Sequence, residues 1–189
     1  MSLPLTVPKS ALDKYIPIKL ISQSANGCIF ASVRKNDTKP TLSSPLALKI
    51  PPPNDDREAL LGRLESLRDF DSRRITKVID YDSRGNWYIT PLYLGQSLQH
   101  LKETLFGDGF PPFLICRIFV EVIAAQGNEL GPKGVCHADL RGSNIILSPT
   151  TKEELPYVRI VHLEGIAVWH EQAIVRQMIG LLQYLTNNA

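Results

Sequence analysis

The segment from His137 to Leu147 combines residue types that phosphoryl-transfer chemistry requires. A carboxylate such as Asp139 could orient an attacking hydroxyl group and accept its proton, and an amide oxygen five residues later, at Asn144, could reach a metal ion beside the transferred phosphate. Arg141 lies between them and adds a positive charge. A simpler interpretation is a polar loop before a buried strand, in which Asp139 only forms a turn.

Lys49 is a second candidate, because it lies inside the short apolar run 46–50. A lysine on a buried strand needs an anionic partner, since removing an unpaired ammonium group from water is costly. Nucleotide phosphates and a carboxylate from the following helix would provide this partner. We expect Glu58 to be that carboxylate, with Glu65 as the second choice. The alternative is an edge-strand lysine that points to water.

The first half of the chain is mainly of strand type. The predicted strands are 16–21, 28–33, 46–50, 76–81 and 87–90, and the first two form a hairpin around the polar turn 22–27. One helix follows the third strand and ends near Phe70, with N-cap chemistry from Asn54, Asp55 and Asp56. Residues 1–14 are expected to form an N-terminal arm. The fold class is therefore α+β.

The second half of the chain is mainly helical. Leucines at helical spacing predict a helix over 98–105, a strongly apolar run predicts another over 113–125, and a third is expected over 171–184. The last helix carries an apolar stripe, and we expect a protein partner or a second copy of the chain to cover it.

The composition is that of an ordinary globular protein, with 189 residues of which 43% are hydrophobic. Basic residues exceed acidic ones by two and are scattered, which argues against nucleic-acid binding. The three cysteines have no metal-ligand spacing, so we expect reduced thiols in a cytoplasmic protein. No apolar stretch approaches the ~18 residues of a spanning helix, so we expect no association with a membrane.

The segment from His137 to Leu147 resembles the catalytic loop of protein kinases, H-R-D-L-x-x-x-N followed by an apolar strand. Asp139 and Asn144 match the catalytic aspartate and the metal-binding asparagine of the family. Arg141 stands where serine/threonine kinases commonly place a lysine near the transferred phosphate. Ala138 replaces the arginine of the family, which implies a protein that is not switched by phosphorylation of an activation loop.

Two upstream motifs support the resemblance. The segment 22–30 is similar to the phosphate-covering loop G-x-G-x-x-G-x-V, with Ser22 and Ser24 at the first two glycine positions and Gly27 at the third. The serines should allow a hairpin but weaken its grip on phosphates. The run 46–50 is similar to the V-A-I-K strand, which implies that Lys49 holds ATP phosphates and pairs with a helix glutamate, here Glu58.

The segment 87–98 resembles the hinge of kinases, with Thr90 as the gatekeeper. The carbonyl of Pro91 and the amide of Tyr93 would bind adenine, and the proline does not prevent this because it keeps its carbonyl. The resemblance implies a two-lobed fold. An N-terminal lobe over 15–90 with a five-stranded antiparallel sheet, a hinge over 91–96 and a reduced, mainly helical C-terminal lobe over 97–189 are expected.

The expected metal site departs from the family. His162 stands in place of the D-F-G aspartate, which holds magnesium, and an imidazole is a poor ligand for an ion that prefers hard oxygen donors. Glu164 could replace the aspartate if the strand end is rearranged. The activation segment and substrate-docking loop of typical kinases also have no counterpart after Gly165, so the chain resembles small atypical kinases.

Three functions follow from the resemblance. The first is a pseudokinase, a regulatory or decoy binding module that binds ATP or no nucleotide. The second is an atypical serine/threonine protein kinase that uses a modified magnesium or manganese site. The third, which we rank lowest, is a small-molecule phosphotransferase. The His162 substitution favours the pseudokinase, because it impairs the metal site.

Overall fold

The computed structural model describes residues 6–24, 26–36, 45–53, 55–107, 109–150 and 155–186. The chain forms two compact units. The first unit consists of Met1–Asp71 and Lys77–Leu92, and the second of Ser72–Thr76 and Tyr93–Ala189. The short segment Ser72–Thr76 therefore belongs to the second unit, although the residues on both sides of it belong to the first.

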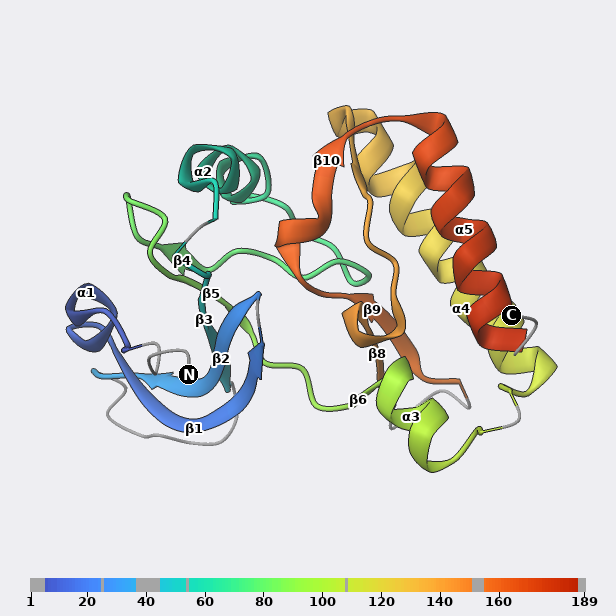
Figure 1. The fold of residues 1–189 in the computed structure, drawn as a ribbon, viewed down its shortest axis with the longest axis horizontal. Coiled ribbons are helices and arrows are strands. Elements are labelled where there is room, and N and C mark those ends of the chain that lie inside the picture. Colours follow the sequence, from blue (N-terminus) through green and yellow to red (C-terminus); the bar gives the residue numbers. More distant parts are fainter. Residues whose placement is uncertain are drawn as a thin grey trace. The chain divides into compact units, whose positions relative to one another are not determined.

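A five-stranded antiparallel sheet forms most of the first unit, with the strand order β1-β2-β3-β5-β4 (Figure 1). Its strands are β1 (Tyr15–Ser24), β2 (Gly27–Arg34), β3 (Leu46–Ile50), β4 (Asp80–Tyr81) and β5 (Tyr88–Pro91). The prediction of a five-stranded antiparallel sheet is confirmed. The predicted strand 76–81 is shortened to β4, because Ile75 and Thr76 pair with Ile160 within the second unit.

The core of the first unit is built around β3, whose five residues are all buried. Leu48 and Ile50 of this strand pack with Trp87 and Ile89. Because neither face of the strand is exposed to water, apolar and polar residues do not alternate along it. The prediction of a buried strand at this apolar run is confirmed.

A short helix, α1 (Lys9–Leu12), lies in the segment that was expected to be an arm. Ala11 is fully buried in the core of the first unit, and the Trp87 indole N–H donates a hydrogen bond of 2.8 Å to Ser10 Oγ. The Tyr15 and Trp87 rings meet edge to face, with 5.7 Å between their centroids. The described part of the expected arm is therefore attached to the sheet by packing.

The helix α2 (Arg57–Ser66) follows β3. Asp56 is its N-cap, since its Oδ1 accepts a hydrogen bond of 3.0 Å from the amide of Ala59. Leu60 and Leu64 are the buried residues of the helix. The helix ends before the predicted position near Phe70, because residues 67–70 continue as turns in which Leu67 and Phe70 remain buried.

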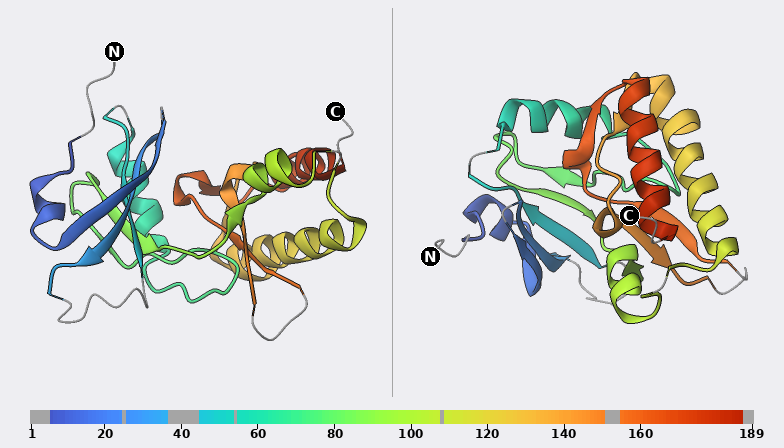
Figure 2. Two further views of the ribbon diagram at one scale, coloured as in Figure 1. Left: turned by 90° about the horizontal axis from the view of Figure 1, so that it is seen from below. Right: turned by 45° about the vertical axis from the view of Figure 1, so that its right-hand side comes forward.

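Three α-helices form the predicted helical part of the second unit: α3 (Leu98–Thr104), α4 (Pro112–Ala124) and α5 (Glu171–Thr186). Helices α4 and α5 lie side by side (Figure 2). A π-helical turn, η1 (Ala125–Leu130), extends α4, and a 3-10 turn, η2 (Gly131–Lys133), follows it. Within the described part of the chain, no helix has the length and apolar character needed to cross a membrane.

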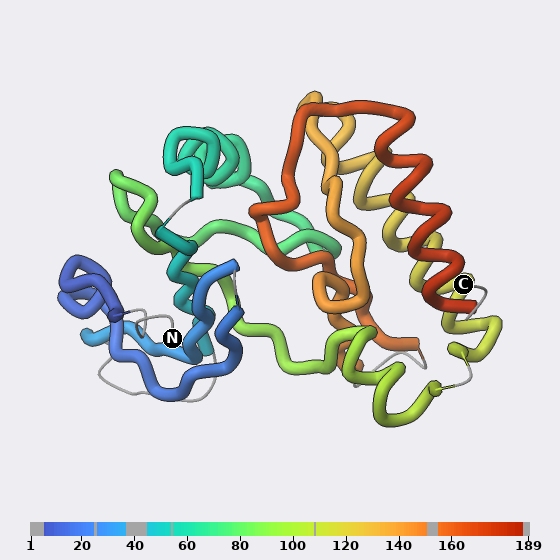
Figure 3. Tube along the Cα trace, in the orientation of Figure 1, coloured from blue at the N-terminus to red at the C-terminus, as the bar shows by residue number. Residues whose placement is uncertain are grey.

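Two small antiparallel sheets complete the second unit. One pairs β7 (Val135–His137) with β10 (Ile166–Val168), and the other has the order β6-β8-β9, with β6 (Gln96–Ser97), β8 (Ile145–Ser148) and β9 (Tyr157–Ile160). The segment 138–144 connects β7 to β8 and includes the 3-10 turn η3 (Gly142–Asn144) (Figure 3). We call residues 137–144 the candidate catalytic loop. Both of its ends are thus attached to strands.

An arginine–glutamate network holds the segment Ser72–Thr76 against α4 and η1. The buried Glu121 carboxylate lies 2.5 Å from Arg74 Nε, 3.0 Å from Arg117 Nη1 and 3.7 Å from Arg73 Nη2. Arg74 Nη1 also lies 2.7 Å from Glu129 Oε1. The buried carboxylate is thereby surrounded by positive charge, which offsets its desolvation.

Candidate functional site

The candidate catalytic loop brings together the three residues that its sequence motif singled out. Asp139 Oδ1 accepts a hydrogen bond of 2.5 Å from Arg141 Nε, and Oδ2 accepts one of 2.9 Å from Asn144 Nδ2. The same Asn144 nitrogen donates to the backbone carbonyl of Asp139 at 3.0 Å. The Asp139 carboxylate is therefore held by one cation and one amide.

His137 connects this loop to the strand end at residues 161 and 162. Its Nε2 lies 3.2 Å from the carbonyl of Val161 and 2.9 Å from that of His162, so this nitrogen must donate. Nδ1 accepts from the amide of Asp139 at 3.3 Å. Burial lowers the pKa of His137, which keeps the imidazole neutral with its hydrogen on Nε2.

Two glutamines hold the backbone on either side of Asp139. The buried Gln126, in the π-helical turn η1, donates from Nε2 to the His137 carbonyl at 2.7 Å and accepts from the His137 amide at 2.9 Å. Gln177 of α5 accepts from the amide of Leu140 at 3.1 Å through its Oε1. These side chains were not predicted from the sequence. The one available signal was a polar residue, Gln126, directly after a long apolar helical run.

The strand end after β9 has an unusual backbone at His162. This residue has φ 70° and ψ 79°, a left-handed conformation that side chains other than glycine rarely adopt. The 3-10 turn η4 (Leu163–Gly165) follows, with Leu163 fully buried. Gly165 lies against the His137 ring, where a Cβ atom would be 2.5 Å from Cε1. The turn is thus packed closely on the candidate catalytic loop.

Two of the three expected metal ligands, His162 and Glu164, lie beside each other, and the third, Asn144, is on an adjoining segment. The amide of Val161, next to His162, donates to the Asn144 carbonyl at 2.8 Å, so these segments are close. His162 Nδ1 lies 3.6 Å from Glu164 Oε2, which places the carboxylate beside an imidazole. Among the described residues, no group of three or more histidine, cysteine, aspartate or glutamate side chains could hold a metal ion. A hard ion that needs several oxygen ligands is poorly served by this set.

The first unit places Lys49 in its interior. The side chain is buried on β3, opposite Ile29 and Tyr88 in the sheet, and its Nζ lies 5.5 Å from the centroid of the Tyr88 ring. Glu58 and Glu65 lie on α2 with exposed side chains. The lysine is therefore inside the unit and both candidate carboxylates are at its surface.

The hairpin of the first unit is tighter than the sequence suggested. β1 continues through Ser24 and β2 begins at Gly27, so strands occupy positions 22–24 and 27 of the predicted turn 22–27. Ser22 and Ser24 are exposed. Gly27 has φ 103°, and a Cβ atom there would lie 2.1 Å from the carbonyl oxygen of Ile50. This glycine is thus required by the approach of β2 to β3.

The residues of the expected hinge lie in both units. Thr90 is buried on β5 opposite Ala47, and Pro91 is opposite Leu46 at the end of the same strand. Tyr93 begins the main part of the second unit, and its ring lies 4.5 Å from the Arg159 guanidinium carbon. The adenine contacts expected of Pro91 and Tyr93 stay predictions.

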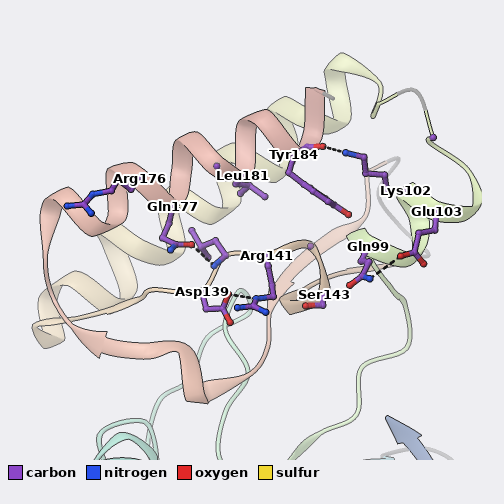
Figure 4. Close-up of a pocket in the computed structure, with 14 residues that line it drawn as sticks. Gln99, Lys102, Glu103, Asp139, Arg141, Ser143, Arg176, Gln177, Leu181 and Tyr184 are labelled. Carbon is purple, nitrogen blue, oxygen red and sulfur yellow. Dashed lines mark hydrogen bonds and ion pairs between the residues drawn. The ribbon is translucent and has the colours of Figure 1, made fainter. Parts of the chain in front are cut away.

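A pocket of about 810 Å³ opens beside Asp139 within the second unit (Figure 4). Helix α3, the candidate catalytic loop and helix α5 form its walls. Its charged lining side chains are Lys102 and Glu103 from α3, Asp139 and Arg141 from the loop, and Arg176 from α5.

Comparisons with known proteins concern the fold of this chain. No protein-family model matches the sequence. The chain is 22% identical over 167 residues to the human serine/threonine-protein kinase ULK3, and equally identical to the mouse protein. The match covers 87% of this chain and 35% of each relative, so the chain spans about a third of the length of the curated relatives it matches.

Solved structures of the PknI kinase domain of Mycobacterium tuberculosis are similar to this one. The unmutated domain has a TM-score of 0.75 at 17% identity, covering 93% of this chain and 75% of that one. A double mutant has a TM-score of 0.77 at 16% identity, covering 93% and 76%. The chain has a protein-kinase-like fold. Within this kinase-like fold, only residues 166–170 separate η4 from α5.

Proposed function

We propose that this kinase-like chain is a pseudokinase, a module that binds other molecules and does not transfer phosphate. The observation that carries the proposal is the set of groups at the expected metal position, where His162 and Glu164 face each other at 3.6 Å. An imidazole paired with a carboxylate does not supply the oxygen ligands that magnesium prefers. Asp139 can hold and orient a hydroxyl group, but His162 stands where an aspartate would hold the metal ion beside a phosphate.

A second function, an atypical serine/threonine kinase, is favoured by the candidate catalytic loop. Asp139, Arg141 and Asn144 are joined by hydrogen bonds, and Gln126 and Gln177 hold the adjoining backbone. Such preorganisation is what a working catalytic loop needs.

The two functions differ in phosphate transfer. We expect the protein, incubated with labelled ATP and magnesium or manganese, to transfer no label to itself or to a generic protein substrate. His162→Asp is the informative variant, because aspartate tolerates the left-handed backbone of this position and supplies a metal-binding oxygen. Metal should raise the melting temperature of His162→Asp more than that of the wild type. Label incorporation by the wild type that disappears in Asp139→Asn would contradict the pseudokinase.

Nucleotide binding is a separate question, which a thermal-shift titration with ATP answers. A ligand that binds only the folded state adds about RT ln(1 + [L]/Kd) to stability. A shift without metal would support a nucleotide-binding pseudokinase that uses Lys49. The absence of a shift under any condition would limit the proposal to a protein-binding module.

The two long helices, α4 and α5, carry exposed apolar side chains that the expected protein partner or second copy could cover. Val175, Ile179 and Leu182 of α5 are exposed, with fractions of 51%, 53% and 41%. Phe113 and Val120 of α4 are exposed at 61% and 62%. We therefore propose that a protein partner or a second copy of the chain covers these side chains. Light scattering of the purified chain tests self-association.

A further inference from the structure

We propose that the pocket beside Asp139 binds an acidic peptide segment of a partner, through carboxylate or phosphate oxygens. This inference rests on the proposed function as a binding module and names the chemistry of what the second unit binds. A volume of about 810 Å³ lies within the roughly 300 to 1,000 Å³ of typical ligand pockets and far exceeds a single ion. The pocket therefore accommodates several groups of a peptide.

The acceptor atoms of the pocket are largely occupied by protein donors. Arg141 Nε donates to Asp139 Oδ1 at 2.5 Å, and Asn144 Nδ2 donates to Asp139 Oδ2 at 2.9 Å. Glu103 Oε1 accepts from Gln99 Nε2 at 3.0 Å. A cationic or donor-rich ligand would have to displace these hydrogen bonds.

Three side chains of the pocket, Gln177, Arg176 and Lys102, have hydrogens that they could donate to a ligand. Gln177 uses Oε1 for the Leu140 amide, and no described residue accepts from its Nε2. The Arg176 guanidinium, at one end of the pocket, makes no ion pair within the described segments (Figure 4). Lys102 Nζ donates to the Tyr184 carbonyl at 2.5 Å and keeps two further hydrogens. An occupant with several oxygen acceptors would satisfy these groups.

The charged side chains of the pocket lining carry a net positive charge. The lining includes three cationic side chains, Lys102, Arg141 and Arg176, and two anionic ones, Asp139 and Glu103. Arg141 is already paired with Asp139, which leaves Lys102 and Arg176 against a single carboxylate. An anionic occupant balances the remaining charge, and a cationic one increases it.

The shape of the pocket depends on two glycines. A Cβ atom at Gly180 of α5 would have no other atom within 4 Å, so the wall is open there. A Cβ atom at Gly142 would lie 2.6 Å from the Tyr184 hydroxyl oxygen, so that end of the pocket is closely packed. Burial and the nearby Glu103 raise the pKa of Tyr184, which stays protonated. The open wall at Gly180 is the position at which a larger side chain would occupy the pocket.

The experiment measures peptide binding in the absence of nucleotide. Fluorescence anisotropy is recorded with a labelled octapeptide that alternates glutamate with alanine, and with its phosphoserine and lysine counterparts. Arg176→Gln removes a pocket cation, and Arg68→Gln removes an exposed cation of the first unit as the matched control. Gly180→Leu fills the open wall, and leucine is also the better helix former.

We expect at least one acidic peptide to bind and the lysine peptide not to bind. Arg176→Gln should weaken binding by roughly tenfold, as for a lost charge-assisted hydrogen bond, while Arg68→Gln leaves it unchanged. Gly180→Leu should abolish binding with an equal or higher melting temperature, which separates a filled pocket from unfolding. The two acidic peptides distinguish carboxylate from phosphate recognition.

The inference is overturned if neither acidic peptide binds, if the lysine peptide binds as tightly, or if the two arginine variants behave alike. These results are independent of phosphate transfer. Label transfer by the wild type would refute the pseudokinase but not the peptide site. A chain that neither transfers phosphate nor binds an acidic peptide would keep the first proposal and lose this one.

Discussion

Asp139 is also positioned by residues that do not contact its carboxylate. Gln126 holds the peptide groups of His137, Gln177 holds the amide of Leu140, and the His137 ring ties the loop to residues 161 and 162. The Asp139 side chain, which Arg141 and Asn144 also hold, therefore has little freedom to move. A loop with this many fixed peptide groups presents the same surface to any partner, whether or not phosphate is transferred.

Replacing Gln126 with methionine should destabilise the protein by about 2 to 4 kcal/mol, because the buried amide and carbonyl of His137 both lose their hydrogen-bond partner. Urea unfolding measures this change. Gln172→Met, at an exposed position of α5, makes the same replacement without removing a buried hydrogen bond. Equal stability of the two variants would show that Gln126 does not hold the loop.

Gly27 is expected to be more sensitive to substitution than its place in a weak motif suggests. Gly27→Ala should lower stability by more than about 1 kcal/mol, because alanine is strained at φ 103° and its Cβ would meet the Ile50 carbonyl. Gly62→Ala in α2, where a Cβ atom has open space, should raise stability by about 0.5 to 1 kcal/mol. Thermal unfolding of both variants, with opposite shifts, checks the prediction.

The segment Ser72–Thr76 belongs to the second unit because its hydrogen bonds and ion pairs are made there. Its neighbours on both sides belong to the first unit, yet Thr76 bonds to the carbonyl of Ile160, and Arg74 binds Glu121 and Glu129. The hydrogen bond to Glu129 makes the largest contribution to the raised pKa of Arg74, and the hydrogen bond to Glu121 makes a smaller one. Charge therefore anchors this segment on α4 and η1.

Glu121→Gln should destabilise the second unit by about 1 to 3 kcal/mol, because it leaves the half-buried guanidinium groups of Arg74 and Arg117 without their central carboxylate. Hydrogen exchange of residues 72–76 should become faster at the same time. Glu65→Gln, an exposed change on α2, is the control and should have little effect. Unchanged exchange in the Glu121 variant would show that packing alone holds the segment.

The buried His137 predicts how the stability of the whole molecule changes in acid. Its pKa in the folded state lies below its value of 6.5 in the unfolded chain, mainly because burial disfavours the charged imidazole. The unfolded state therefore binds more protons, and stability is lost as the pH falls below about 6.5. Urea unfolding between pH 7.5 and pH 5 should show this slope. His137→Asn should reduce it, whereas His100→Asn, at an exposed position, should not.

Much of the fold could be predicted because local patterns set it. The apolar run at β3, the cap at Asp56 and the leucine spacing of the helices each depend on neighbours in the sequence. The contacts of Gln126 with His137 and of Gln177 with Leu140 join residues 11 and 37 positions apart, which no local pattern encodes. The motif singled out Asp139, Arg141 and Asn144, which the structure joins by hydrogen bonds. Their catalytic roles, the lobe boundaries, ATP, the partner and the cytoplasmic location stay predictions.

The π-helical turn η1 has a consequence for changes of chain length. A π-helical turn contains one residue more than an α-helical turn, so the segment Ala125–Leu130 behaves as a one-residue insertion in α4. Deleting Gly127, which has open space around it, would restore a regular helix and rotate the preceding residues by about 100° relative to the loop. Gln126 would then point away from His137, so the deletion of one residue in the helix would release the candidate catalytic loop.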